Sequence, residues 1–168
     1  MLTNIFMYIS ICIMRHHIFT ENQRNFIISE SPKNDTIYNY VNLLKKNSIN
    51  LVINLTENIL YDTNKLKNAN IDYLHLPVKD GDVPTDDKLK NLILFLQRYN
   101  SIAFHCVAGI GRAPLFCALT FIILFNYKPL DIITKIREKE PSAFNTIQIN
   151  YLLHFRRNKY VENSCTIT

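Results

Sequence analysis

The segment HCVAGIGRAP, residues 105–114, holds the side chains that are best suited to chemistry in this sequence. Five residues separate Cys106 from Arg112, and two of the chain's three glycines, Gly109 and Gly111, lie between them. Glycine allows the φ angles that a tight loop requires. When such a loop precedes a helix, its backbone N–H groups can close around an anion the size of one phosphate.

The cysteine and the arginine would act on an anion held in this loop. Arg112 can bind two phosphate oxygens through its planar guanidinium group. A positive environment favours the thiolate form of Cys106, and a thiolate beneath a phosphate is a nucleophile in line with phosphorus. The alternative is an inert buried thiol in an ordinary strand-to-helix turn. The residues expected to contact the phosphate are Val107, Ala108, Gly109, Ile110 and Gly111.

A leaving group needs a proton, and the upstream segment KDGDVP supplies two candidate general acids, Asp80 and Asp82. Asp-Gly is also common in turns that have no catalytic role. Spacing alone does not choose between the two carboxylates.

The apolar runs of the chain predict an α/β fold with a central, mainly parallel sheet flanked by helices. Strands are expected at residues 25–29, 49–55, 71–76 and 101–105. Helices are expected at residues 35–47, 85–100, 112–126, 130–139 and 143–157. Ligands of such sheets bind beyond the carboxyl ends of the strands. The phosphate loop and the loop that carries Asp80 both follow a strand in this way.

Composition narrows the functional class. The chain has 168 residues, of which 48% are hydrophobic and 20% charged, so we expect one globular domain. Its net charge of +5 suits an anionic ligand, an acidic partner or a membrane surface. The basic residues are too dispersed for nucleic-acid binding. The four cysteines are far apart, which argues against a zinc site and a disulfide scaffold and favours an intracellular, cytoplasmic location.

From Asn22 to Arg157 the sequence resembles the cysteine-based protein tyrosine phosphatases, and more narrowly the type IVA, or phosphatase-of-regenerating-liver, proteins. HCVAGIGRAP is close to that family's phosphate loop, and its alanine after the arginine is unusual among relatives. LPVKDGDVP resembles the family's acid loop. LYDT at residues 60–63 and SAFNTIQINYL at residues 142–152 match two further segments in the family's order.

The resemblance implies the protein tyrosine phosphatase fold at dual-specificity size and a two-step reaction without metal or cofactor. Cys106 would attack the phosphate of a phosphoprotein, on phosphotyrosine and also on phosphoserine or phosphothreonine, to form a phosphocysteine. Asp80 would protonate the leaving oxygen and then activate water, while Arg112 holds the phosphate. The supporting residues would be His105, Asn145 and Gln148.

Several departures from the family bear on activity and regulation. Ala113 stands where faster relatives carry serine or threonine, which predicts slow phosphocysteine breakdown. The alternative is a phosphate-binding interaction module with negligible turnover. A phosphoinositide phosphatase is disfavoured because no lysine lies inside the phosphate loop. Thr56 stands nearest to the family's second cysteine, so a disulfide switch is not expected, and Leu76 replaces the tryptophan that opens the acid loop.

Partners and the chain ends give further expectations. The family binds cyclin-M-type magnesium transporters partly through an acidic residue before the general acid, and Lys79 reverses that charge, which argues against this partner. Cys165 is placed like a prenylated cysteine, and prenylation there would give weak membrane association. We expect residues 1–21 to form an N-terminal extension, with Met14 as a candidate start. Residues 22–158 would be the phosphatase domain and residues 159–168 a tail.

Overall fold

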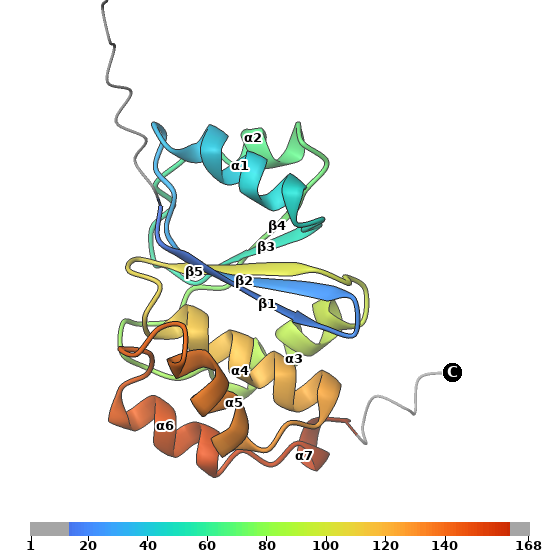
Figure 1. Cartoon of the computed structure of the whole chain (residues 1–168), viewed down its shortest axis with the longest axis vertical. Helices are drawn as coiled ribbons and strands as arrows, with labels where there is room; N and C mark the ends of the chain where they lie inside the picture. Colours follow the sequence, from blue (N-terminus) through green and yellow to red (C-terminus); the bar gives the residue numbers. More distant parts are fainter. Residues whose placement is uncertain (1–13, 162–168) are drawn as a thin grey trace, which may run out of the picture.

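A five-stranded sheet forms the centre of the computed structural model, which describes residues 14–161 (Figure 1). The strands lie in the order β1-β2-β5-β3-β4, and only β1 and β2 pair antiparallel. Their bounds are β1 His16–Glu21, β2 Arg24–Glu30, β3 Leu51–Asn54, β4 Asp72–His75 and β5 Ile102–Cys106. The predicted fold class, a mainly parallel sheet flanked by helices, is confirmed.

Helices cover both faces of the sheet (Figure 1). On one face lie α1 Ile37–Lys46 and α2 Asn64–Lys67. On the other lie α3 Asp86–Leu96, α4 Arg112–Phe125, α5 Pro129–Arg137, α6 Thr146–Leu153 and α7 Asn158–Val161. The layers leave the loops after β2, β3, β4 and β5 together at one edge of the sheet, where the parallel strands end.

The strand β5 and the helix α4 form the buried spine of the fold. All five residues of β5 are buried, because neighbouring strands flank it and helices cover both of its faces. The helix α4 is buried from Arg112 to Ile123. Aromatic rings pack between this helix and the sheet: Phe121 contacts Phe19 and Phe26 edge to face. The spine therefore fixes both ends of the phosphate loop.

The strand β1 was not expected from the sequence. It pairs with β2 through a hairpin whose turn residues, Asn22 and Gln23, have φ angles of 47° and 61°. An edge strand buries few side chains, and in β1 only Phe19 is fully buried, so its apolar pattern is weak. The sheet thus extends past the expected boundary at residue 22. Residues 1–13 and the tail beyond residue 161, with Cys165, lie outside the described residues.

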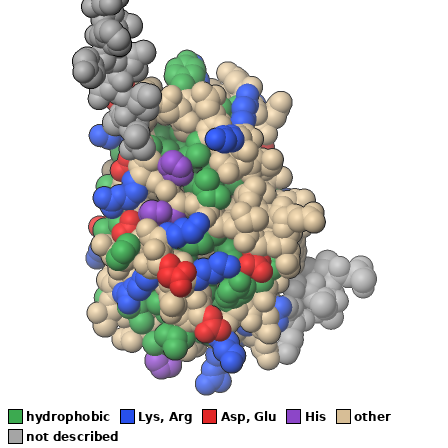
Figure 2. Space-filling view, in the orientation of Figure 1, with side chains coloured by type: hydrophobic (Ala, Val, Ile, Leu, Met, Phe, Trp, Pro, Cys, Tyr) green, Lys and Arg blue, Asp and Glu red, His purple; other side chains and the backbone are tan. Residues whose placement is uncertain are grey.

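The surface carries its charges in small, mixed groups. Figure 2 shows basic side chains scattered among acidic, apolar and other residues on the face that it draws. Between residues 14 and 161, none of the helices has the length and apolar character needed to cross a membrane.

Candidate active site

The phosphate loop, residues 107–111, connects β5 to α4. At Gly109 the φ angle is 74°, and a Cβ atom there would lie 2.8 Å from backbone atoms of Ser29 and Glu30. Only glycine fits this position. Gly111 differs from the expectation, because its φ of −118° suits any residue. A Cβ at this position would lie 3.4 Å from the Gln148 amide, which is an ordinary van der Waals contact.

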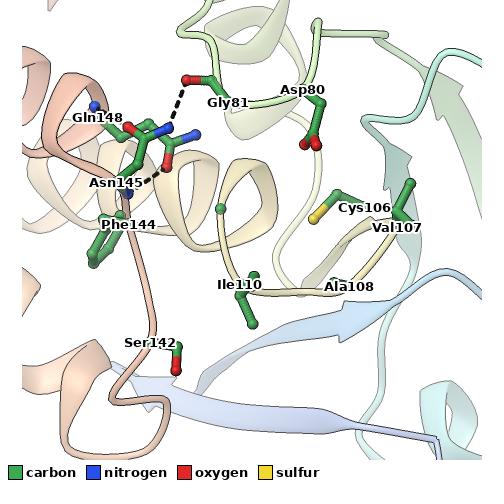
Figure 3. Close-up of a pocket in the computed structure, with 11 residues that line it drawn as sticks. Asp80, Gly81, Cys106, Val107, Ala108, Ile110, Ser142, Phe144, Asn145 and Gln148 are labelled. Atoms are coloured by element: carbon green, nitrogen blue, oxygen red, sulfur yellow. Dashed lines mark hydrogen bonds between the residues drawn. The ribbon is translucent and has the colours of Figure 1, made fainter.

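A pocket of about 280 Å³ opens above this loop (Figure 3). Cys106 is 3% exposed and lies on the same side as the Asp80 carboxylate, while Asn145 and Gln148 face them across the pocket (Figure 3). The lining residues are Asp80, Gly81, Cys106, Val107, Ala108, Ile110, Gly111, Ser142, Phe144, Asn145 and Gln148. The structure therefore gathers most of the sequence-predicted site residues from three separate segments.

Arg112 is fully buried at the start of α4, with 1% of its side chain exposed. Its Nη1 donates to the carbonyl oxygens of Val78 and Leu55, at 2.8 and 3.3 Å, and contacts Glu57 Oε2 at 2.7 Å. Its Nη2 lies 3.0 Å from Asp80 Oδ1. Its Nε is buried and has no hydrogen-bond partner among residues 14–161. Nη1 is thus anchored in the protein, whereas Nε is buried without a partner. Gly109 and Arg112, two of the predicted site residues, lie outside the pocket lining.

Glu57 is a site residue that the sequence analysis missed. Besides its ion pair with Arg112, its Oε1 accepts a hydrogen bond from the backbone N–H of Asp80 at 3.2 Å. The hydrogen bond from Arg112 holds the pKa of Glu57 below its usual value. Glu57 therefore joins the buried arginine to the acid loop. Glu57 lies three residues after β3, beyond the carboxyl end of the strand, where ligands of parallel sheets bind. This position could have indicated its role from the sequence.

The acid loop is tied to the N-terminus of α6. Asn145 Nδ2 donates to Gly81 O at 2.8 Å, and Gln148 Nε2 donates to Asp82 O at 3.3 Å. The same two side chains form a capping box on α6. Asp80, whose side chain is 86% exposed, lines the pocket. The Asp82 carboxylate instead accepts from the N–H of Val83 and lies outside the lining.

His105 lies outside the pocket lining, directly before Cys106, with its side chain packed toward α1. A hydrogen bond joins its Nε2 to the Tyr61 hydroxyl, 2.8 Å away, and it is fully buried. Burial lowers the pKa of His105 to about 3, with a smaller contribution from His75. The imidazole is therefore neutral at physiological pH, and it packs on the face of the sheet that α1 covers, against Tyr40 and Tyr61. Tyr61 is buried, lies outside the pocket lining and is therefore a packing residue.

Comparisons with known sequences agree on one family. A family model described as "Polymorphic toxin system, DSP-PTPase phosphatase" matches residues 28–124. Protein tyrosine phosphatase type IVA 3 of Mus musculus is 34% identical over 137 residues, 78% of this chain and 78% of the relative. PRL-1 phosphatase of Drosophila melanogaster is 31% identical over 154 residues, 84% of this chain and 86% of the relative.

A comparison with solved structures agrees. The structure of a protein tyrosine phosphatase from Leishmania major superimposes with a TM-score of 0.72 at 28% identity, covering 80% of this chain and 90% of that one.

The Gly109 geometry predicts that Gly109→Ala weakens oxyanion binding. The added Cβ would overlap the backbone of β2 at a φ that favours glycine, so the loop must move. We expect at least about tenfold weaker tungstate binding by isothermal titration calorimetry, equivalent to about 1.4 kcal/mol. Gly111→Ala is the matched control and should lose less, because a Cβ there would make only an ordinary contact with the Gln148 side chain. Equal losses in both variants would contradict this assignment.

The buried state of His105 predicts a specific pH dependence of stability. The unfolded chain protonates this histidine near pH 6.5, whereas the folded protein does so only near pH 3. The free energy of unfolding should therefore fall as pH drops from about 6.5 toward about 3, by at most about 1.4 kcal/mol per pH unit from this group. Urea unfolding at a series of pH values should show that the free energy of unfolding falls less steeply with decreasing pH in His105→Gln than in the wild-type protein. His154→Gln, at an exposed histidine, should keep the wild-type slope; a shared slope in all three proteins would refute the prediction.

Proposed function

The chain belongs to the protein tyrosine phosphatases of type IVA, and from this premise we propose that Cys106, Arg112 and Asp80 carry its reaction. The protein is a cysteine-based phosphatase that acts on phosphoproteins. One observation carries the assignment of residues most: the buried Arg112 guanidinium, anchored through Nη1, directly follows the loop that begins at Cys106.

In the proposed first step, the substrate phosphate lies in the phosphate loop above Cys106. The backbone N–H groups of the loop and the N-terminus of α4 stabilise its negative charge. Arg112 binds two phosphate oxygens through Nε and Nη2, and the phosphate takes the place of Asp80 on Nη2. Cys106 Sγ then attacks phosphorus, so that the Sγ–P bond forms as the bond from phosphorus to the tyrosyl oxygen breaks.

Asp80 supplies and later removes the proton. As a carboxylic acid it protonates the departing tyrosyl oxygen, and the resulting carboxylate then accepts a proton from water. That water attacks phosphorus, the Sγ–P bond breaks, and inorganic phosphate and the Cys106 thiolate are released. The placement of Asp80 in the pocket lining, and of Asp82 outside it, supports this choice.

Glu57, Asn145 and Gln148 are positioning residues in this proposal. Glu57 fixes the Arg112 guanidinium and the backbone of Asp80 at the same time. The two amides hold the acid loop from the opposite wall. Because each works through another residue, their loss should misplace the acid loop without removing a reacting group.

We propose that turnover is slow, because Ala113, fully buried at the second residue of α4, has no hydroxyl to assist departure of the thiolate.

Phosphotyrosine is the proposed substrate, with phosphoserine and phosphothreonine as further candidates. Lys79 is exposed and reverses the charge of the family's acidic residue, which argues against the magnesium-transporter partner. The basic side chains are scattered, which argues against binding of nucleic acid. An intracellular, cytoplasmic location, with weak membrane association if Cys165 is prenylated, completes the proposal.

Rapid mixing with p-nitrophenyl phosphate tests the phosphocysteine route. We expect a burst of about one equivalent of nitrophenol followed by slow steady turnover, both lost in Cys106→Ser. Ala113→Ser should raise the steady rate, because it supplies the missing hydroxyl, and leave the burst amplitude near one equivalent. A burst with no steady phase would favour a phosphate-binding module, and full activity of Cys106→Ser would overturn the route.

Steady-state assays with a phosphotyrosyl peptide should distinguish the roles of the two carboxylates of the acid loop, Asp80 and Asp82. Asp80→Ala should lower kcat by roughly 100- to 1,000-fold, the range typical of a lost general acid, with little change in tungstate binding. Asp82→Ala is the matched control and should lose less than about fivefold, since its carboxylate only caps Val83. A larger loss in Asp82→Ala would move the general acid to that residue.

A further inference from the structure

Three exposed apolar residues lie in the loops that follow β3 and β5, at the end of the sheet where the pocket opens. Among residues 14–161, the large apolar residues with high exposure on α1, α3, α5 and α6 are scattered along helices. Ile59, Leu60 and Val107 are instead in loops, and are 48%, 46% and 58% exposed. Single exposed apolar residues are ordinary on a protein surface, whereas a group beside a ligand pocket marks a binding surface.

The loops that carry these residues leave the sheet side by side. The strands β3 and β5 pair up to Asn54 and His105, and the Leu55 N–H continues the ladder by donating to His105 O at 3.0 Å. Val107 follows His105 by two residues and lies across the pocket from Asn145 and Gln148 (Figure 3). Val107 therefore borders the loop that begins after β3.

Glu57 ties the other two residues to the site. Its carboxylate contacts Arg112 and the backbone of Asp80. Because consecutive Cα atoms are about 3.8 Å apart, the Cα of Ile59 lies at most about 7.6 Å from that of Glu57. Ile59 and Leu60 are outside the pocket lining, two and three residues after Glu57, which itself contacts the backbone of the lining residue Asp80.

The loop is held rigidly on both sides of Ile59 and Leu60. Before them, the Thr56 N–H donates to Asn54 Oδ1, and the Thr56 hydroxyl donates to the carbonyl oxygen of Asn58. After them, Tyr61 is buried with its hydroxyl bonded to His105. The Asp62 N–H then donates to Asn34 Oδ1 at 2.9 Å. The exposed pair is thus presented on a fixed base, which lowers the entropic cost of binding.

We propose that Ile59, Leu60 and Val107 form an apolar shelf that receives an apolar side chain next to the phosphotyrosine of the substrate. The inference rests on the proposed function, because the phosphotyrosine must occupy the pocket for its neighbour to reach the shelf. An extended chain advances about 3.3–3.6 Å per residue, so a residue one or two positions from the phosphotyrosine lies within about 7.2 Å of it along the chain. The shelf has no ionisable side chain and selects by burial of apolar surface.

Matched phosphotyrosyl peptides test the shelf. One series carries leucine, and the other serine, at the first and second positions on the amino side or on the carboxyl side of the phosphotyrosine. Wild-type kcat/KM should favour one leucine peptide by roughly five- to tenfold, as expected for partial burial of one apolar side chain. In the double variant Ile59→Ser/Leu60→Ser this preference should fall below about twofold.

The control is Leu94→Ser/Leu130→Ser, which removes two comparably exposed leucines from α3 and α5, at 51% and 64% exposure. It should keep the wild-type preference. Equal kcat/KM for all peptides, from a wild-type protein that turns over p-nitrophenyl phosphate, would overturn the shelf alone. No turnover of p-nitrophenyl phosphate would instead sink the proposed function.

Other occupants of the shelf would give different results. If the double substitution leaves the peptide preference unchanged but abolishes self-association in gel filtration, the shelf binds a second copy of the chain. If it abolishes binding to vesicles of anionic phospholipid instead, the shelf meets a membrane. Either result would overturn the proposal.

Discussion

The buried guanidinium of Arg112 is the constraint on which the rest of the site depends. A charged group with 1% exposure is costly unless hydrogen bonds and opposite charges compensate it. Here two backbone carbonyls and Glu57 satisfy Nη1, and Asp80 lies on Nη2. These partners come from the loops after β3 and β4, so the arginine draws both loops toward the phosphate loop. Its Nε is buried without a partner among the described residues, and we propose that a bound anion supplies that partner.

The remainder of the fold keeps these loops in register with the nucleophile. The strand β5 is buried along its whole length and delivers Cys106 to the floor of the pocket. Behind it, neutral His105 and Tyr61 fill the α1 side of the sheet without contacting the pocket. On the far wall, the cap residues of α6 hold the acid loop by its backbone, which leaves the Asp80 carboxylate exposed to a substrate.

Much of this arrangement could be predicted from residue type and spacing. The Cys106–Arg112 loop, the strands near residues 49–55 and 101–105, and the helix that begins at Arg112 all carry strong local signals. The choice of Asp80 over Asp82 as the expected acid needed the family resemblance, since both lie in one turn. Local patterns could not give β1, because only Phe19 of this edge strand is fully buried and no alternating apolar pattern results. The position of Glu57 after β3 was a signal, but local patterns could not give its role, which comes from a buried arginine 55 residues away.

The central claim, that Arg112 is anchored through Nη1 and receives the phosphate through Nε and Nη2, can be tested by one measurement. A crystal structure of Cys106→Ser with tungstate in the phosphate loop would show the contacts directly. We predict that Nε and Nη2 each bond to a tungstate oxygen, that Asp80 has left Nη2, and that Nη1 still contacts Val78 O, Leu55 O and Glu57. A tungstate bound in the loop without Arg112, or an arginine that has lost its Nη1 partners, would contradict the account.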